Sequence, residues 1–100
     1  MDKDKIQQIQ FLEQNLQSVL MQKQAFQMEY SENNVAIGEI KKSEEKIYRM
    51  IGQLMISVNK DKILDELESK EKLIKARIDA LSKQEESLRN ELQKIDPISK

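Results

Sequence analysis

The chain has 100 residues, of which 35% are charged and 4% are aromatic, and it contains neither cysteine nor histidine. This composition, rich in Glu, Lys, Gln, Leu and Ile, is typical of long helices and coiled coils. The 17 basic and 18 acidic residues are spread along the chain, so no basic block exists that would bind nucleic acid. The missing cysteines and histidines exclude disulfides, thiol chemistry and the usual zinc ligands.

Nothing in the sequence predicts a membrane segment or an enzyme. No apolar run approaches the roughly 18 residues that span a bilayer, and the opening MDKDKIQQIQ lacks the apolar region of a signal peptide. We therefore expect a soluble cytoplasmic protein without a membrane partner. No phosphate-binding glycine loop or nucleophile elbow occurs, and the adjacent carboxylates of Glu44-Glu45 and Glu85-Glu86 would not face each other on a helix. We expect no catalytic residue, no metal and no cofactor.

A first long helix is predicted over residues 5–42. Its apolar residues follow a heptad pattern, in which two columns of positions, a and d, form one narrow seam. Column a holds Ile9, Leu16, Lys23, Tyr30 and Ile37, and column d holds Leu12, Val19, Phe26, Asn33 and Ile40. Such a seam must be buried against another helix.

A second long helix is predicted over residues 60–95, with Asn59 as its N-cap and Pro97 marking its end. Residues 96–100 form a short tail. Column a of this helix holds Leu64, Glu71, Ile78, Glu85 and Leu92, and column d holds Leu67, Ile74, Leu81, Leu88 and Ile95. If the connection turns back on itself, the two helices run antiparallel, and Tyr30 and Asn33 then lie roughly opposite Glu71.

The connection, residues 46–58, changes from helical spacing to the alternation of a strand. Gly52-Gln53 fits a two-residue type II′ turn, which has glycine at its first position. The predicted cross-strand pairs on one face are Ile51 with Leu54, Arg49 with Ile56 and Ile47 with Val58; those on the other are Met50 with Met55 and Tyr48 with Ser57. The alternative is that the helix simply continues through 46–58 and tolerates Gly52.

A hairpin of this kind has two faces and two edges to cover. A lone hairpin is marginally stable in water, and its unpaired edges invite further strands. We therefore expect hairpins from several subunits to pair into a common sheet or β-barrel. The expected fold is mainly α: a single domain over 1–100, built as an antiparallel two-helix coiled coil with one central β-hairpin that oligomerises.

A helix, a central hairpin and a second helix in this order resemble the β class of prefoldin subunits, of the archaeal type. The central segment IYRMIGQLMISVNKDK is similar to that family's hairpin, and LIKARIDALSKQEESLRNEL, residues 73–92, is similar to the second helical arm of archaeal subunits. One hairpin indicates the β class, since α-class subunits carry two. The tail after Ile95 is shorter than in many members.

The resemblance implies a function for these parts. It implies a hexamer of two α-type and four β-type subunits joined through β-barrels. Residues Ile47, Tyr48, Met50, Ile51, Gly52, Leu54, Met55, Ile56 and Val58 would form the oligomerisation hairpin. It further implies ATP-independent capture of unfolded polypeptides at the arm tips and their delivery to a group II chaperonin. The alternative from another class is a structural coiled-coil adaptor that binds one defined partner helix.

If the arms bind clients, the ends far from the hairpin should offer apolar surface. Ile6, Phe11 and Ile98 lie off the seam there, and Phe11 occupies a c position, which normally faces water. The seam residues at the same end are Ile9, Leu12, Leu88, Leu92 and Ile95, in a region where helix ends fray. The sequence therefore predicts a client-binding site made of these eight residues.

Overall fold

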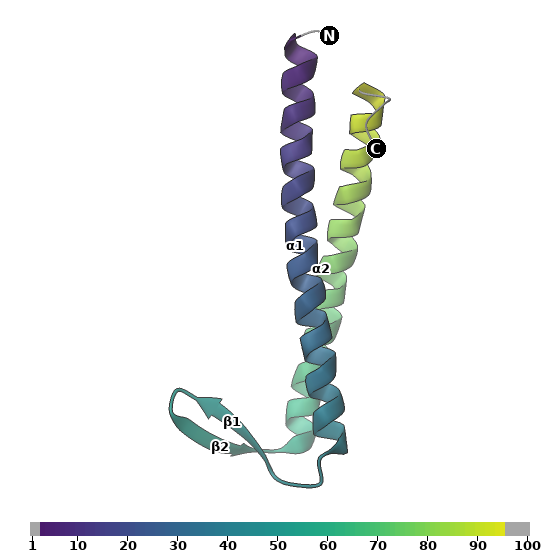
Figure 1. The fold of residues 1–100 in the computed structure, drawn as a ribbon. Coiled ribbons are helices and arrows are strands. Elements are labelled where there is room, and N and C mark those ends of the chain that lie inside the picture. Colours follow the sequence, from purple (N-terminus) through teal and green to yellow (C-terminus); the bar gives the residue numbers. More distant parts are fainter. Residues whose placement is uncertain (1–2, 96–100) are drawn as a thin grey trace. The chain divides into compact units, whose positions relative to one another are not determined.

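The computed structural model describes residues 3–95 and shows two long helices joined by a β-hairpin (Figure 1). The elements are α1 (Lys3–Lys42), β1 (Ile47–Ile51), β2 (Leu54–Val58) and α2 (Lys60–Ile95). The predicted helix–hairpin–helix fold is confirmed, although α1 begins at Lys3 rather than Lys5 and β1 begins at Ile47 rather than Lys46. The described residues form two compact units: one combines α1 up to Gln27 with α2 from Ala76, and the other is Met28–Lys75.

The first unit is a two-helix coiled coil with a mainly apolar seam. Its core is a cluster of Ile9, Leu12, Leu16 and Leu92, against which Leu88 and Ile95 pack. Val19 and Leu81 are buried as well. All these residues hold a or d positions in the predicted heptads, and a fully buried leucine contributes about 1.5–3 kcal/mol relative to an exposed one. The seam thus holds the two helical segments together.

The second unit contains the end of α1, the hairpin and the start of α2. Its buried residues are Asn33, Ile37, Ile63 and Ile74. The heptad pattern assigned Leu64 to the seam, but Leu64 is half-buried and its neighbour Ile63 is 8% exposed. Ile63 and Ile74 are separated by about three turns of a helix with 3.6 residues per turn, so both lie on the same face of a nearly straight α2. For this reason Ile63, and not the heptad residue Leu64, is turned toward α1.

The two helix ends beside the hairpin are both capped. Asn59 Oδ1 accepts hydrogen bonds from the backbone N–H groups of Asp61 at 2.9 Å and Lys62 at 3.2 Å, which confirms the predicted N-cap of α2. Lys60 Nζ donates to the carbonyls of Lys41 at 3.3 Å and Ser43 at 2.9 Å, at the C-terminus of α1. A cation suits that end of the helix dipole. Lys60 therefore ties the start of α2 to the end of α1.

α2 is described up to Ile95, so its predicted end at that residue remains a prediction. Pro97, to which the sequence assigned this end, and Ile98 lie outside the described residues.

Candidate functional site

The hairpin has the register that the sequence predicts. Ile47 pairs with Val58, Tyr48 with Ser57, Arg49 with Ile56, Met50 with Met55 and Ile51 with Leu54. Because successive side chains alternate between faces, these pairs form one mainly aliphatic face and one face of Met50, Met55, Tyr48 and Ser57.

Gly52 supplies the turn. Its φ is +61°, a conformation that residues with a Cβ rarely adopt, and Gln53 does not share a positive φ. A positive φ at the first turn residue alone is the pattern of type II′, whereas type I′ requires it at both. The turn therefore matches the twist of the two strands and fixes their register.

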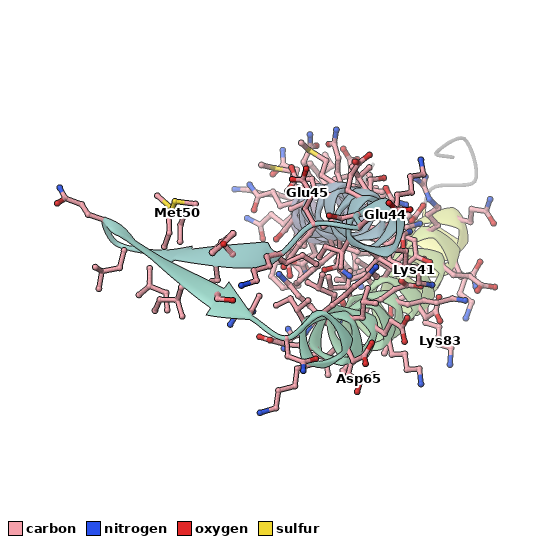
Figure 2. The ribbon with its side chains drawn as sticks, turned by 90° about the horizontal axis from the view of Figure 1, so that it is seen from below. Lys41, Glu44, Glu45, Met50, Asp65 and Lys83 are labelled. Atoms are coloured by element: carbon pink, nitrogen blue, oxygen red, sulfur yellow. The ribbon has the colours of Figure 1, made fainter. Side chains whose placement is uncertain are left out.

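Both faces of the hairpin are exposed. Figure 2 shows the strands extending from the helices of the second unit, with Met50 on one side and the side chains of other hairpin residues on the opposite side. The exposed fractions are 64% for Met50, 65% for Met55, 55% for Ile51, 67% for Leu54, 50% for Tyr48 and 43% for Ile56. The sheet has two strands, so each strand keeps one edge without a partner strand. An apolar, two-edged ribbon of this kind is a typical interaction surface.

Arg49 attaches the hairpin to α2. It lies on the aliphatic face of β1, and its guanidinium Nη2 donates to Glu66 Oε2 at 2.8 Å. Both side chains are largely exposed, so the pair contributes at most about 1 kcal/mol. The sequence placed Arg49 opposite Ile56 but gave no partner for its charge, because nothing local relates β1 to the second turn of α2.

The predicted client-binding residues divide into two groups. Ile6 is 42% exposed and Phe11 63% exposed. Ile9, Leu12 and Leu92 are buried in the core of the first unit, and Leu88 and Ile95 pack against them. Ile9, Leu12 and Leu92 would meet a client only if the helix ends separated, whereas Leu88 and Ile95 are only partly buried. Ile98 lies outside the described residues.

A charged cluster interrupts the seam of the first unit. Lys23 Nζ donates to Glu85 Oε1 at 3.0 Å, and Arg89 Nε donates to Glu85 Oε2 at 3.0 Å. These two bonds, with Lys23 the larger influence, hold the pKa of the Glu85 carboxyl below its ordinary value. The heptad pattern placed both Lys23 and Glu85 in column a, but the sequence analysis did not predict that these two residues form a pair.

A polar layer in the second unit matches the predicted one. Tyr30 Oη lies 3.5 Å from Glu71 Oε1, and Asn33 Nδ2 donates to the backbone carbonyl of Leu67 at 2.8 Å. Asn33 is only 5% exposed. The expected position of Tyr30 opposite Glu71 is therefore confirmed. Asn33 instead contacts Leu67, a partner that the sequence did not predict.

Residues 3–95 offer neither a metal-binding cluster nor a membrane-spanning helix. Within that range, no three side chains of His, Cys, Asp or Glu come together as they would to ligate a metal ion. Neither described helix combines the length and the apolar character needed to cross a bilayer.

Two packed helices, an exposed central hairpin and a capped junction define a class of coiled-coil subunits, and comparison with known proteins identifies the family. Residues 3–96 match a family described as "Prefoldin subunit". The chain belongs to this family of chaperone subunits, as its sequence resemblance indicated.

The relatives point to the β class. The chain is 38% identical over 90 residues to "Prefoldin subunit beta" of Thermococcus onnurineus, covering 88% of this chain and 78% of the relative. It is also 38% identical over 88 residues to "Prefoldin subunit beta" of Pyrobaculum arsenaticum, covering 85% and 71%. A crystal structure of the prefoldin β subunit from Thermococcus strain KS-1 has a TM-score of 0.86 at 32% identity and covers 93% of this chain and 83% of that one.

Proposed function

We propose that this chain is the β-class subunit of an ATP-independent co-chaperone, acting in the cytoplasm as one prefoldin-type domain over its whole length. It assembles through its hairpin with α-class subunits and with further copies of itself, in a hexamer of two α and four β subunits. The assembly captures unfolded polypeptides and delivers them to a group II chaperonin. Membership of the prefoldin family supports this proposal.

The exposure of the hairpin is the observation that carries the assembly step. Ile51, Leu54 and Ile56 on one face and Met50 and Met55 on the other are each between 43% and 67% exposed. Burying the rest of such side chains would contribute on the order of 1 kcal/mol each. Pairing hairpins into a closed β-barrel covers the inner face and removes the free edges together.

Client capture rests on the apolar side chains at the open end of the first unit. Ile6 and Phe11 are the exposed residues of the predicted set and provide the first contact. The buried Ile9, Leu12 and Leu92 and the partly buried Leu88 and Ile95 add apolar surface when that end opens, and Ile98 belongs to the same predicted site. Each contact is weak, but arms acting together raise the overall affinity through multivalency.

The assembly step is tested by charging the aliphatic face of the hairpin. Replacing Ile51 and Ile56 with Asp should give smaller assemblies in light scattering, because burying two carboxylates in a barrel is strongly unfavourable. Far-ultraviolet circular dichroism should remain helical, since neither residue contributes to the buried core.

Leu73→Asp is the matched control, because Leu73 is 62% exposed on α2 and lies outside the hairpin. It should leave the assembly size unchanged. An unchanged size in the Ile51/Ile56 double variant would contradict hairpin-driven assembly and favour the adaptor alternative.

A further inference from the structure

Apolar packing holds the hairpin to the helices only at its base. Ile47 and Val58, the pair next to the helices, are half-buried, whereas the other residues of both strands are exposed. Asn59 alone separates β2 from α2, while residues 43–46 separate α1 from β1. Packing at the base therefore does not fix the angle that the outer part of the hairpin makes with α2.

Arg49 connects the outer part of the hairpin to α2. It lies two residues beyond Ile47 on the same face of β1, and its Nη2 donates to Glu66 Oε2 at 2.8 Å. Arg49 is the only charged residue of 47–58, so no other residue of that range can form an ion pair with a helix. Asn59 joins β2 to the start of α2 and Arg49 joins β1 to its second turn, so the two attachments together define the angle.

A hollow lies between the hairpin and the start of α2. The strands contribute Arg49 and Val58 to its lining, and α2 contributes Lys62, Ile63 and Glu66. Because side chains leave this space open, the pair of guanidinium and carboxylate spans it instead of apolar contact.

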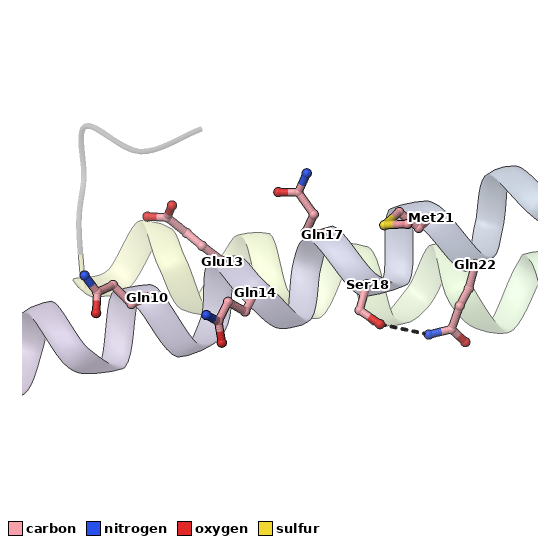
Figure 3. A pocket seen from close by; sticks show the side chains of 7 residues that line it. All are labelled: Gln10, Glu13, Gln14, Gln17, Ser18, Met21 and Gln22. Atoms are coloured by element: carbon pink, nitrogen blue, oxygen red, sulfur yellow. Dashed lines mark hydrogen bonds between the residues drawn. The ribbon is translucent and has the colours of Figure 1, made fainter.

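A hollow alone does not link two elements, as the first unit shows. Gln14, Gln17 and Met21 border a hollow on α1 there (Figure 3), and Gln22 Nε2 donates to Ser18 Oγ within it at 3.2 Å. Every residue that lines this hollow belongs to α1. The hollow beside the hairpin differs, because two elements line it and opposite charges bridge it.

We propose that the Arg49–Glu66 ion pair sets the angle between the hairpin and α2 at which hairpins of different subunits pair. This inference rests on the proposed assembly through the hairpin. Closing a barrel requires a consistent tilt and stagger of all its strands, so hairpins held at different angles cannot close one barrel. Arg49 and Glu66 are positioning residues that add little to the stability of the subunit, since both side chains are largely exposed.

Two spin labels measure this angle, because the chain has no cysteine of its own. Gln53→Cys places one label at the turn, and Lys72→Cys places the other on the exposed side of α2, both within the second unit. Double electron–electron resonance should give one narrow distance distribution, measured at a protein concentration at which light scattering shows single subunits. Glu66→Arg sets a cation against Arg49 and should lower the population at the wild-type distance by about five-fold, the effect of losing an exposed ion pair.

An exchanged pair provides the rescue. Glu66→Arg should also give smaller assemblies in light scattering, with unchanged helicity, and adding Arg49→Glu should return both the distance distribution and the assembly size to those of wild type. Glu68→Arg is the matched control: it makes the same charge reversal two residues along α2 and breaks the Lys41–Glu68 pair of 3.7 Å, which does not involve the hairpin. It should leave both measurements unchanged. Salt at about 1 M, which screens exposed charges, should broaden the wild-type distribution without any substitution.

The two measurements separate this inference from the proposed function. An unchanged distribution in Glu66→Arg, or one that the exchanged pair does not restore, would overturn the assigned role of the ion pair. A changed distribution with an unchanged assembly size would overturn the link between the angle and assembly. Wild-type chains that form no assembly would instead contradict the proposed function, and the distance distribution would still decide whether the ion pair holds the angle.

Discussion

Replacing Asn33 with Asp should destabilise the protein strongly at neutral pH and only weakly in acid. Asn33 is 5% exposed and donates from Nδ2 to the carbonyl of Leu67 at 2.8 Å. The introduced carboxylate has no proton to donate and sets an oxygen against that carbonyl. The lost hydrogen bond removes about 1 kcal/mol.

Burial of the new negative charge accounts for the larger part of the expected loss of stability. A buried carboxyl has a raised pKa, and each unit of that rise removes about 1.4 kcal/mol of stability at pH values above both the folded and the unfolded pKa. A rise of about two units, reasonable at the interface of two helices, gives a total loss of about 3–4 kcal/mol at pH 7. Because the folded pKa is the higher one, the deficit is small below the unfolded value of about 4 and grows as the pH rises to the folded value. Once protonated, the carboxyl can donate to the Leu67 carbonyl again.

The assay is urea unfolding of wild type and variant, followed by circular dichroism from pH 4 to pH 8. Asn34→Asp is the matched control: it makes the same chemical change at the next residue of α1, which is exposed, and should alter stability by no more than about 0.5 kcal/mol. Equal stability of the two variants at pH 7 would refute the assigned role of Asn33. A deficit for Asn33→Asp that persists unchanged at pH 4 would show that charge burial is not its cause.

Further predictions concern the first unit. Cysteines replacing Leu16 and Leu88 should form a disulfide within one chain, because Leu88 packs against the cluster that contains Leu16, and a product crosslinked only between chains would contradict the antiparallel coil. Glu85→Gln should be less stable than wild type at neutral pH, and the difference should shrink as the pH falls through the lowered pKa of Glu85, as measured by thermal unfolding. Replacing Ile6 and Phe11 with Ser should weaken suppression of client aggregation while the assembly size stays the same, with or without ATP; undiminished activity would remove these two residues from the client site.

The features that the sequence predicted correctly depend on neighbours along the chain. The hairpin register follows from a period of two around Gly52, and the N-cap follows from Asn59 at the start of an apolar pattern. Both are local, so a few residues contain the whole signal. The family resemblance was strongest in the same central segment, and the comparisons confirm it.

The features that the sequence did not predict depend on how separate elements pack, which a local pattern does not contain. Ile63 replaced Leu64 because a heptad count accumulates error against a helix of 3.6 residues per turn. The Arg49–Glu66 and Lys23–Glu85 pairs join residues 17 and 62 positions apart, whose meeting depends on the placement of separate elements. The exposed fractions of the predicted client-binding residues could not be predicted either. Periodicity identifies which residues belong to the seam, but it does not show how completely the partner helix covers them.

Each unit has a polar contact in its seam, and we infer that these contacts help to fix the register of the antiparallel helical segments. Gly52 fixes the register of the two strands, but leucine and isoleucine seams tolerate a slip of one heptad, because one apolar residue then replaces another. In the second unit a slip takes Asn33 away from the Leu67 carbonyl, so that the buried amide must find another acceptor. In the first unit a slip separates Lys23 from Glu85 and sets a half-buried ammonium group against leucine. A fully apolar seam would bury more surface, yet these polar contacts penalise a slip that an apolar seam would tolerate, because each polar group then loses the partner it has in this register.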